Sequence, residues 1–97
     1  MSACAMLTYS GATPAAWACA KEKAASFGVT ITTNTGSATV HGFTVAWNYD
    51  PNAQTASIQC TDSPFWAPCS LINNKINDQV EQCLHQNGVA QVSLIEA

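Results

Sequence analysis

The spacing of apolar residues changes twice along this chain of 97 residues, and these changes limit the folds it can adopt. Between residues 15 and 27 apolar side chains recur every three or four positions, which is typical of one helical face. From residue 29 to residue 60 they alternate with polar side chains, which is typical of strands. From residue 69 the helical spacing returns. The sequence therefore predicts the order helix, three strands, helix.

Three residues mark the limits of the first helix. Thr13 is a good N-cap, and Pro14 suits the first helical position, where its missing N–H costs nothing. Gly28 fits the left-handed position that commonly follows a helix. Trp17 and Phe27 fall on the apolar face of this predicted helix.

Three strands are expected after this helix. The first covers residues 29–33 and is followed by a turn at residues 34–37. The second covers residues 38–49, either as one long strand or as two strands broken at Gly42. The third covers residues 54–60. Because the connections are short, the strands are expected to form an antiparallel meander.

The second helix is expected to run from residue 69 to Gly88, where glycine ends it. Residues 89–95 form either an edge strand or an apolar tail, and the strand is favoured. Residues 1–12 are expected to be a flexible N-terminal segment. With these ends, residues 1–97 make one domain.

These elements predict an α+β fold, a small two-layer α-β-β-β-α domain in which both helices cover one face of an antiparallel meander sheet. Alternate residues of the second strand share one side, namely Phe43, Val45, Trp47 and Tyr49. On the face covered by the helices they would form the core, and on the open face they would form an interaction surface. The sequence leaves these two alternatives open.

Charge is scarce in this chain. Charged residues make up 9%, the net charge is −3, and the basic residues are three lysines without any arginine. Nucleic-acid binding depends on several basic side chains that neutralise phosphates, so nucleic acid is not an expected partner. No apolar run is long enough to cross a membrane, so a membrane is not expected either.

The five cysteines leave at least one thiol unpaired. Two disulfides are conceivable, one from Cys60 to Cys69 across a loop and one from Cys19 to Cys83 between the helices. The alternative is reduced thiols that behave as small apolar side chains, and we favour it, together with a cytoplasmic location. Disulfides, if they form, would instead indicate a secreted or periplasmic protein.

Residues 65–69, Phe-Trp-Ala-Pro-Cys, contain the best candidate for a reactive thiol. Cys69 stands at the expected start of a helix, where free N–H groups stabilise a thiolate. The segment resembles part of the thioredoxin active site, which implies a redox role, although Trp66 stands where that family has its second cysteine. A thiol or redox function of Cys69 is therefore one alternative.

No pattern predicts a metal site, a cofactor or catalysis. Zinc ligands occur as closely spaced pairs, and neither His41 nor His85 has such a partner. The five glycines stand alone, so no phosphate-binding loop is present. We therefore expect no cofactor and no enzyme activity.

Aromatic residues supply the remaining functional candidates. Phe65 and Trp66 lie in a loop between two prolines, and exposed aromatic rings dominate binding energies at interfaces. The expected function is therefore a small non-enzymatic module that binds a protein partner or itself as a homodimer. The other alternative is a carrier of a small apolar ligand on the sheet face lined by Phe43, Trp47 and Tyr49.

Overall fold

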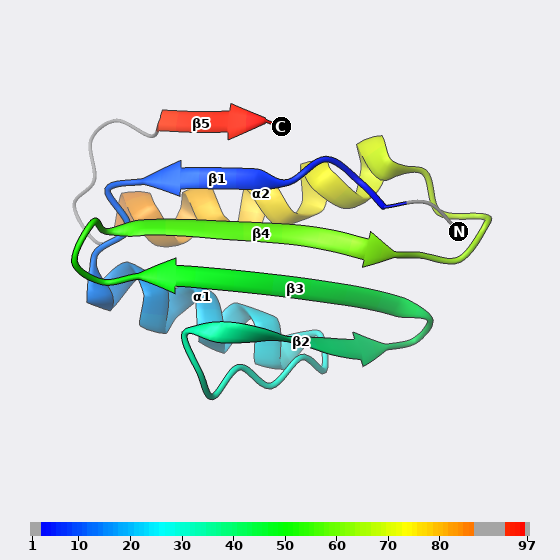
Figure 1. The fold of residues 1–97 in the computed structure, drawn as a ribbon, viewed down its shortest axis with the longest axis horizontal. Coiled ribbons are helices and arrows are strands. Elements are labelled where there is room, and N and C mark those ends of the chain that lie inside the picture. The colour runs from blue at the N-terminus through cyan, green and yellow to red at the C-terminus, as the bar shows by residue number, and fades with distance from the viewer. Residues whose placement is uncertain (1–2, 87–92, 97) are drawn as a thin grey trace.

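The structure is a computed structural model that describes residues 3–86 and 93–96. These residues form β1 (Leu7–Ser10), α1 (Pro14–Ser26), β2 (Thr35–Val40), β3 (Phe43–Asp50), β4 (Thr55–Asp62), α2 (Cys69–Gln86) and β5 (Ser93–Glu96). The strands make one sheet in the order β2-β3-β4-β1-β5, and all neighbours are antiparallel. Both helices lie on the same face of this sheet (Figure 1). The predicted two-layer α+β fold is confirmed.

The first helix begins and ends at the residues that the sequence indicates. The Thr13 hydroxyl accepts a hydrogen bond of 3.2 Å from the Ala16 N–H, and Pro14 occupies the first turn. At the other end Gly28 has a φ of 91°, in the left-handed region that favours glycine. The local sequence therefore accounts for both limits of α1.

The hairpin between β2 and β3 turns at His41 and Gly42. Both residues have positive φ, 52° and 84°, which is the geometry of a two-residue type I′ turn. Val40 and Phe43 pair directly across it. Of the two alternatives for residues 38–49, two strands separated at Gly42 is therefore the observed one.

The predicted strand at residues 29–33 and the predicted turn at residues 34–37 are wrong. Residues 29–34 contain no strand, and β2 begins at Thr35. Val29 is buried and Ile31 packs against the core although neither belongs to a strand, so both apolar residues of the alternation contact the core without sheet pairing. The register of β2 follows from the hairpin at His41 and Gly42, which pairs Thr35 with Asn48.

The N-terminal segment contributes a strand, so the prediction that residues 1–12 are flexible is wrong for β1. This strand lies inside the sheet and pairs with β4 on one side and β5 on the other. Leu7 is 2% exposed and Tyr9 is fully buried. The Tyr9 hydroxyl donates a hydrogen bond of 3.1 Å to Asn77 Oδ1 of α2, which ties the sheet to the helix layer. A strand of four residues is too short to show a reliable pattern.

The chain ends in the edge strand that the sequence favours for residues 89–95. Its described part, β5, pairs antiparallel with β1 at the edge of the sheet (Figure 1). Residues 89–92 lie outside the described residues. The same is true of Gly88, the expected end of α2, which the structure describes as far as Gln86.

The aromatic row of β3 faces the helices. Trp47 and Tyr49 are 6% and 5% exposed, and the Trp17 ring of α1 stacks on Tyr49 with 4.8 Å between ring centroids. The Tyr49 hydroxyl donates a hydrogen bond of 2.8 Å to the Ala12 carbonyl. The Trp47 indole N–H donates one of 3.0 Å to the Thr33 carbonyl. Trp47 and Tyr49 therefore belong to the core, and the open-face alternative is wrong.

The burial of β1 generates a test of the fold. Leu7→Ala should lower the free energy of unfolding by roughly 2–5 kcal/mol, because it removes a buried side chain and leaves a cavity. Thr8→Ala is the matched control on the opposite side of the same strand. It removes the contact between the Thr8 and Ser57 hydroxyls and should cost about 1 kcal/mol. Urea denaturation measures both, and equal effects would show that β1 is not part of the core.

Candidate functional site

An apolar cavity of about 400 Å³ lies between the sheet and the two helices and opens to solvent. Its walls come from both helices, from β2, β3 and β4, and from the loop that precedes α2. Pockets that take small molecules measure roughly 300–1,000 Å³ and are lined mainly by apolar side chains. The cavity therefore has the size and the lining of a small-molecule site.

Small side chains on α1 create much of this space. Ala20 and Ala24 line the cavity from α1, where larger residues would reach toward the sheet. From α2, Ile72 and Ile76 form the opposite wall. The strands contribute Val45 among others. The site is therefore a gap between layers, made where alanines face the sheet.

Two aromatic rings limit the cavity where β3 begins. The Phe43 and Trp66 rings meet edge to face, with 5.8 Å between centroids and 87° between planes. Both side chains line the cavity, and Trp66 is also 64% exposed. Trp66 therefore contacts both the solvent and the cavity.

The structure places only some of the predicted site residues at the cavity. It brings Phe43, Trp47 and Trp66 to the cavity. Tyr49 is absent from the wall and lies buried beneath Trp17. Phe65 is 90% exposed and does not line the cavity, so its ring projects into solvent.

The sequence did not predict that residues of the two helices line a cavity. Its apolar contribution comes from side chains on α1 and α2 that helical spacing assigns to the buried faces, namely Ala20, Ala24, Ile72, Ile76 and Val80. That spacing shows which face turns inward, but it does not show whether the two faces touch or leave a space. The small alanine side chains of α1 were the one feature of the sequence that could have indicated such a space.

Four polar side chains also line the cavity: Lys23, His41, Lys75 and Gln79. Lys23 Nζ of α1 donates a hydrogen bond of 3.3 Å to Gln82 Oε1 of α2. Lys75 Nζ of α2 lies 5.3 Å from the centroid of the Phe27 ring, just after α1. Each lysine therefore reaches from one helix to the other. The described residues that line the cavity include no aspartate or glutamate.

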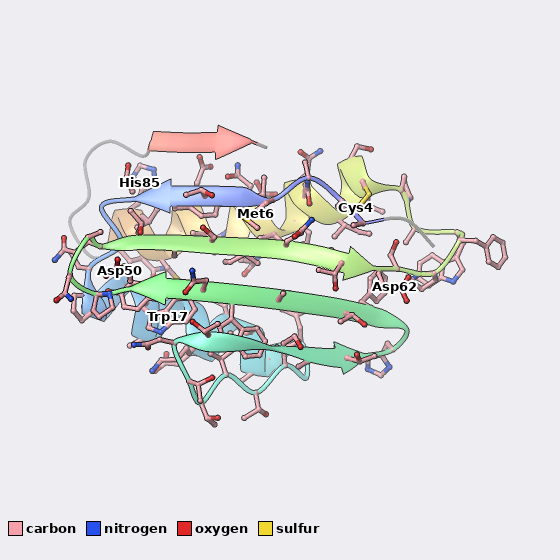
Figure 2. The ribbon with its side chains drawn as sticks, viewed as in Figure 1. Cys4, Met6, Trp17, Asp50, Asp62 and His85 are labelled. Atoms are coloured by element: carbon pink, nitrogen blue, oxygen red, sulfur yellow. A yellow bond between two sulfur atoms is a disulfide. The ribbon has the colours of Figure 1, made fainter. Side chains whose placement is uncertain are left out.

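The wall also contains a buried donor. The Trp17 indole N–H is buried and has no hydrogen-bond partner among the described residues. A buried N–H without a partner costs about 1–3 kcal/mol. Figure 2 shows Trp17 beneath the sheet near the end of β3 that carries Asp50.

Two disulfides tie the helices into the domain. Cys19 of α1 is bonded to Cys83 of α2, with 5.5 Å between Cα atoms, which is one of the two pairings that the sequence left conceivable. The favoured alternative, reduced thiols, is wrong for the four bonded cysteines. Cys69 at the start of α2 is bonded to Cys4, which lies beside it near the N-terminus (Figure 2). The predicted disulfide between Cys60 and Cys69 is therefore wrong. The Cys4 N–H donates to the Cys60 carbonyl at 2.8 Å, so the N-terminal segment carries Cys4 alongside β4 to Cys69.

The remaining cysteine, Cys60, is a buried free thiol. Burial raises the pKa of this thiol, a hydrogen bond with the Asp62 backbone lowers it in part, and the negative charge of Asp62 raises it again. Cys69 has no free thiol because its sulfur is bonded to Cys4. The structure therefore contains no activated thiolate at either position.

Residues 3–86 and 93–96 contain neither a metal-binding cluster nor a helix that could span a membrane. No three histidine, cysteine, aspartate or glutamate side chains in this part of the chain are arranged to hold a metal ion. Neither helix, over its described length, is long and apolar enough to cross a membrane.

Comparisons with protein-family models, with curated proteins and with solved structures found no match to this chain. The fold and the site alone therefore define its class. It is a small α+β domain with two disulfides and an apolar cavity between its sheet and its helices.

The chemistry of Cys60 generates a second test. In the folded, unreduced protein Cys60 should react slowly with iodoacetamide at neutral pH and faster as the pH rises, because its raised pKa keeps it protonated. Mass spectrometry should find one label after denaturation without reductant and five labels after reduction. Fast native labelling, or five labels without reductant, would contradict the assigned thiol states.

Proposed function

We propose that the protein is a non-enzymatic binder of a small apolar molecule, which it holds in the cavity between the sheet and the helices. The observation that carries this proposal is the size and lining of the cavity, about 400 Å³ walled mainly by apolar side chains. Protein interiors are close-packed and contain few voids larger than a water molecule. A cavity of this size therefore departs from ordinary core packing in the way that ligand sites do.

Rigid walls support the same proposal. The Cys19–Cys83 disulfide fixes α1 to α2, and the stack of Trp17 on Tyr49 fixes α1 to the sheet. A site that is formed in advance loses less conformational freedom when a ligand binds. Both constraints favour a preformed pocket over two layers that collapse together.

The disulfides also support a proposal on location. Such bonds persist in oxidising compartments and are rare in the reducing cytosol. We therefore propose that the protein works in a secreted or periplasmic setting, in place of the cytoplasmic location that the sequence favoured. The two bonds, Cys4–Cys69 and Cys19–Cys83, are what supports this.

Phe65 supports a second candidate function, binding of a protein partner or of a second copy of the chain. Its side chain is 90% exposed, although burying a large aromatic ring is favourable. It lies next to Trp66 in the loop before α2. A partner that covered Phe65 would also lie beside Trp66, which lines the cavity.

Ligand binding can be tested with the neutral apolar dye N-phenylnaphthylamine. Trp17, Trp47 and Trp66 all line the cavity, so dye binding should quench tryptophan fluorescence without changing the oligomeric state. Ala24→Phe should weaken binding by about tenfold or more, because it puts a ring into a space suited to roughly one small ligand.

Ala25→Phe is the matched control for that variant. Ala25 is exposed, lies on the same helix and does not line the cavity, so this substitution should leave the dye affinity unchanged. Thermal unfolding should show that both variants fold. Equal affinities of the two variants, or no quenching in the unsubstituted protein, would contradict binding in this cavity.

Self-association through Phe65 has its own test. If Phe65 is a contact between copies, Phe65→Ser should raise the dimer dissociation constant by about tenfold or more, as loss of an interface aromatic residue typically does. Met6→Ser is the control, since Met6 is also an exposed apolar side chain, at 38%. Sedimentation equilibrium measures both. A chain that stays monomeric at every concentration would contradict a dimer at this surface.

A further inference from the structure

The charges of this chain are distributed unevenly around the cavity. The net charge is −3, and six acidic residues outnumber three lysines. Two of those lysines, Lys23 and Lys75, line the cavity, and none of the described residues that line it is acidic. The surface of the cavity is almost entirely apolar, so both lysines contribute mainly their hydrocarbon stems to it, and their ammonium groups contact Gln82 and the Phe27 ring.

Lys75 is available to a ligand. Its side chain is exposed, and its ammonium group lies over the Phe27 ring without an ion pair to any described residue. The face of an aromatic ring attracts a cation but leaves the other N–H donors of the ammonium group free to bind an anion. Lys75 can therefore contact an anionic group without breaking its contact with Phe27.

Lys23 is placed in a similar way on the other helix. It is half-buried, and its hydrogen-bond partner, Gln82, is neutral and leaves the lysine charge uncompensated. Since Lys23 and Lys75 come from α1 and α2, positive charge borders the cavity from both helices.

We propose that the ligand is a single-chain amphiphile with an anionic carboxylate head, whose alkyl chain fills the cavity and whose head binds Lys75 and Lys23. This inference rests on the proposed function and adds the ligand class. The apolar walls recognise the chain, and the two lysines select the sign of the head group. Charge complementarity is what distinguishes this occupant from a neutral apolar molecule or a cationic one.

The test compares three probes that share one alkyl chain and differ in the charge of the head: decanoate, decanol and decyltrimethylammonium. The affinity of each probe is measured from its displacement of N-phenylnaphthylamine from the protein at neutral pH, where decanoate is ionised. We expect decanoate to bind tightest and decyltrimethylammonium weakest. The probes are used well below the concentrations at which they form micelles, so that the dye reports only protein binding.

Lysine variants then identify the groups that recognise the head. Lys75→Gln and Lys23→Gln should each weaken decanoate binding by roughly twofold to fivefold, the range expected for a partly exposed ion pair, and leave decanol binding unchanged. Lys75→Arg should retain the preference for decanoate, because it keeps the charge. Lys21→Gln is the matched control, since it removes the same charge from α1 at a residue that does not line the cavity.

The outcomes separate this inference from the proposed function. Equal affinities for decanoate and decanol, or equal losses in Lys75→Gln and Lys21→Gln, would overturn the anionic head while leaving an apolar ligand in place. Failure of all three probes and of the dye would overturn both. Tightest binding of decyltrimethylammonium would overturn the anionic head by reversing the sign of the selectivity.

Discussion

The stacking of Trp17 on Tyr49 is the contact on which the rest of this structure depends. It joins the first helix to the end of β3 through two large rings, whose centroids are 4.8 Å apart and whose planes are nearly parallel. The hydrogen bond from Tyr49 to the Ala12 carbonyl holds the chain just before α1 against the same ring. With one end of α1 fixed in this way, the helix runs along the sheet behind β3 and β2 (Figure 1).

The cavity follows from how the layers are held. The Cys19–Cys83 disulfide connects the helices, and the Cys4–Cys69 disulfide holds the start of α2 to the N-terminal segment. Between these fixed points the layers face each other with alanines on α1, and these are too small to fill the space. The two disulfides therefore stabilise the small domain and also join elements that form the walls of the pocket.

The proposed binding function and the proposed ligand class depend on different features of this pocket. The apolar walls give affinity for a hydrocarbon chain, because burying apolar surface is favourable in proportion to its area. The lysines contribute little affinity at an exposed entrance, but they discriminate between head groups of opposite charge. In a chain with so few charged residues, the position of two lysines is a specific feature of the surface.

The sequence by itself determined the two helices, the approximate positions of β3 and β4 and the two-layer class, because caps, turns and hydrophobic periods are local properties of the chain. It also left the Cys19–Cys83 pairing conceivable, since both cysteines fall on predicted helices. Only the tertiary structure decided that residues 7–10 form an inner strand, that Cys4 and not Cys60 bonds to Cys69, and that the two layers leave a cavity. These features depend on contacts between residues far apart in the chain, and a local pattern does not specify which distant residues meet or how closely they pack.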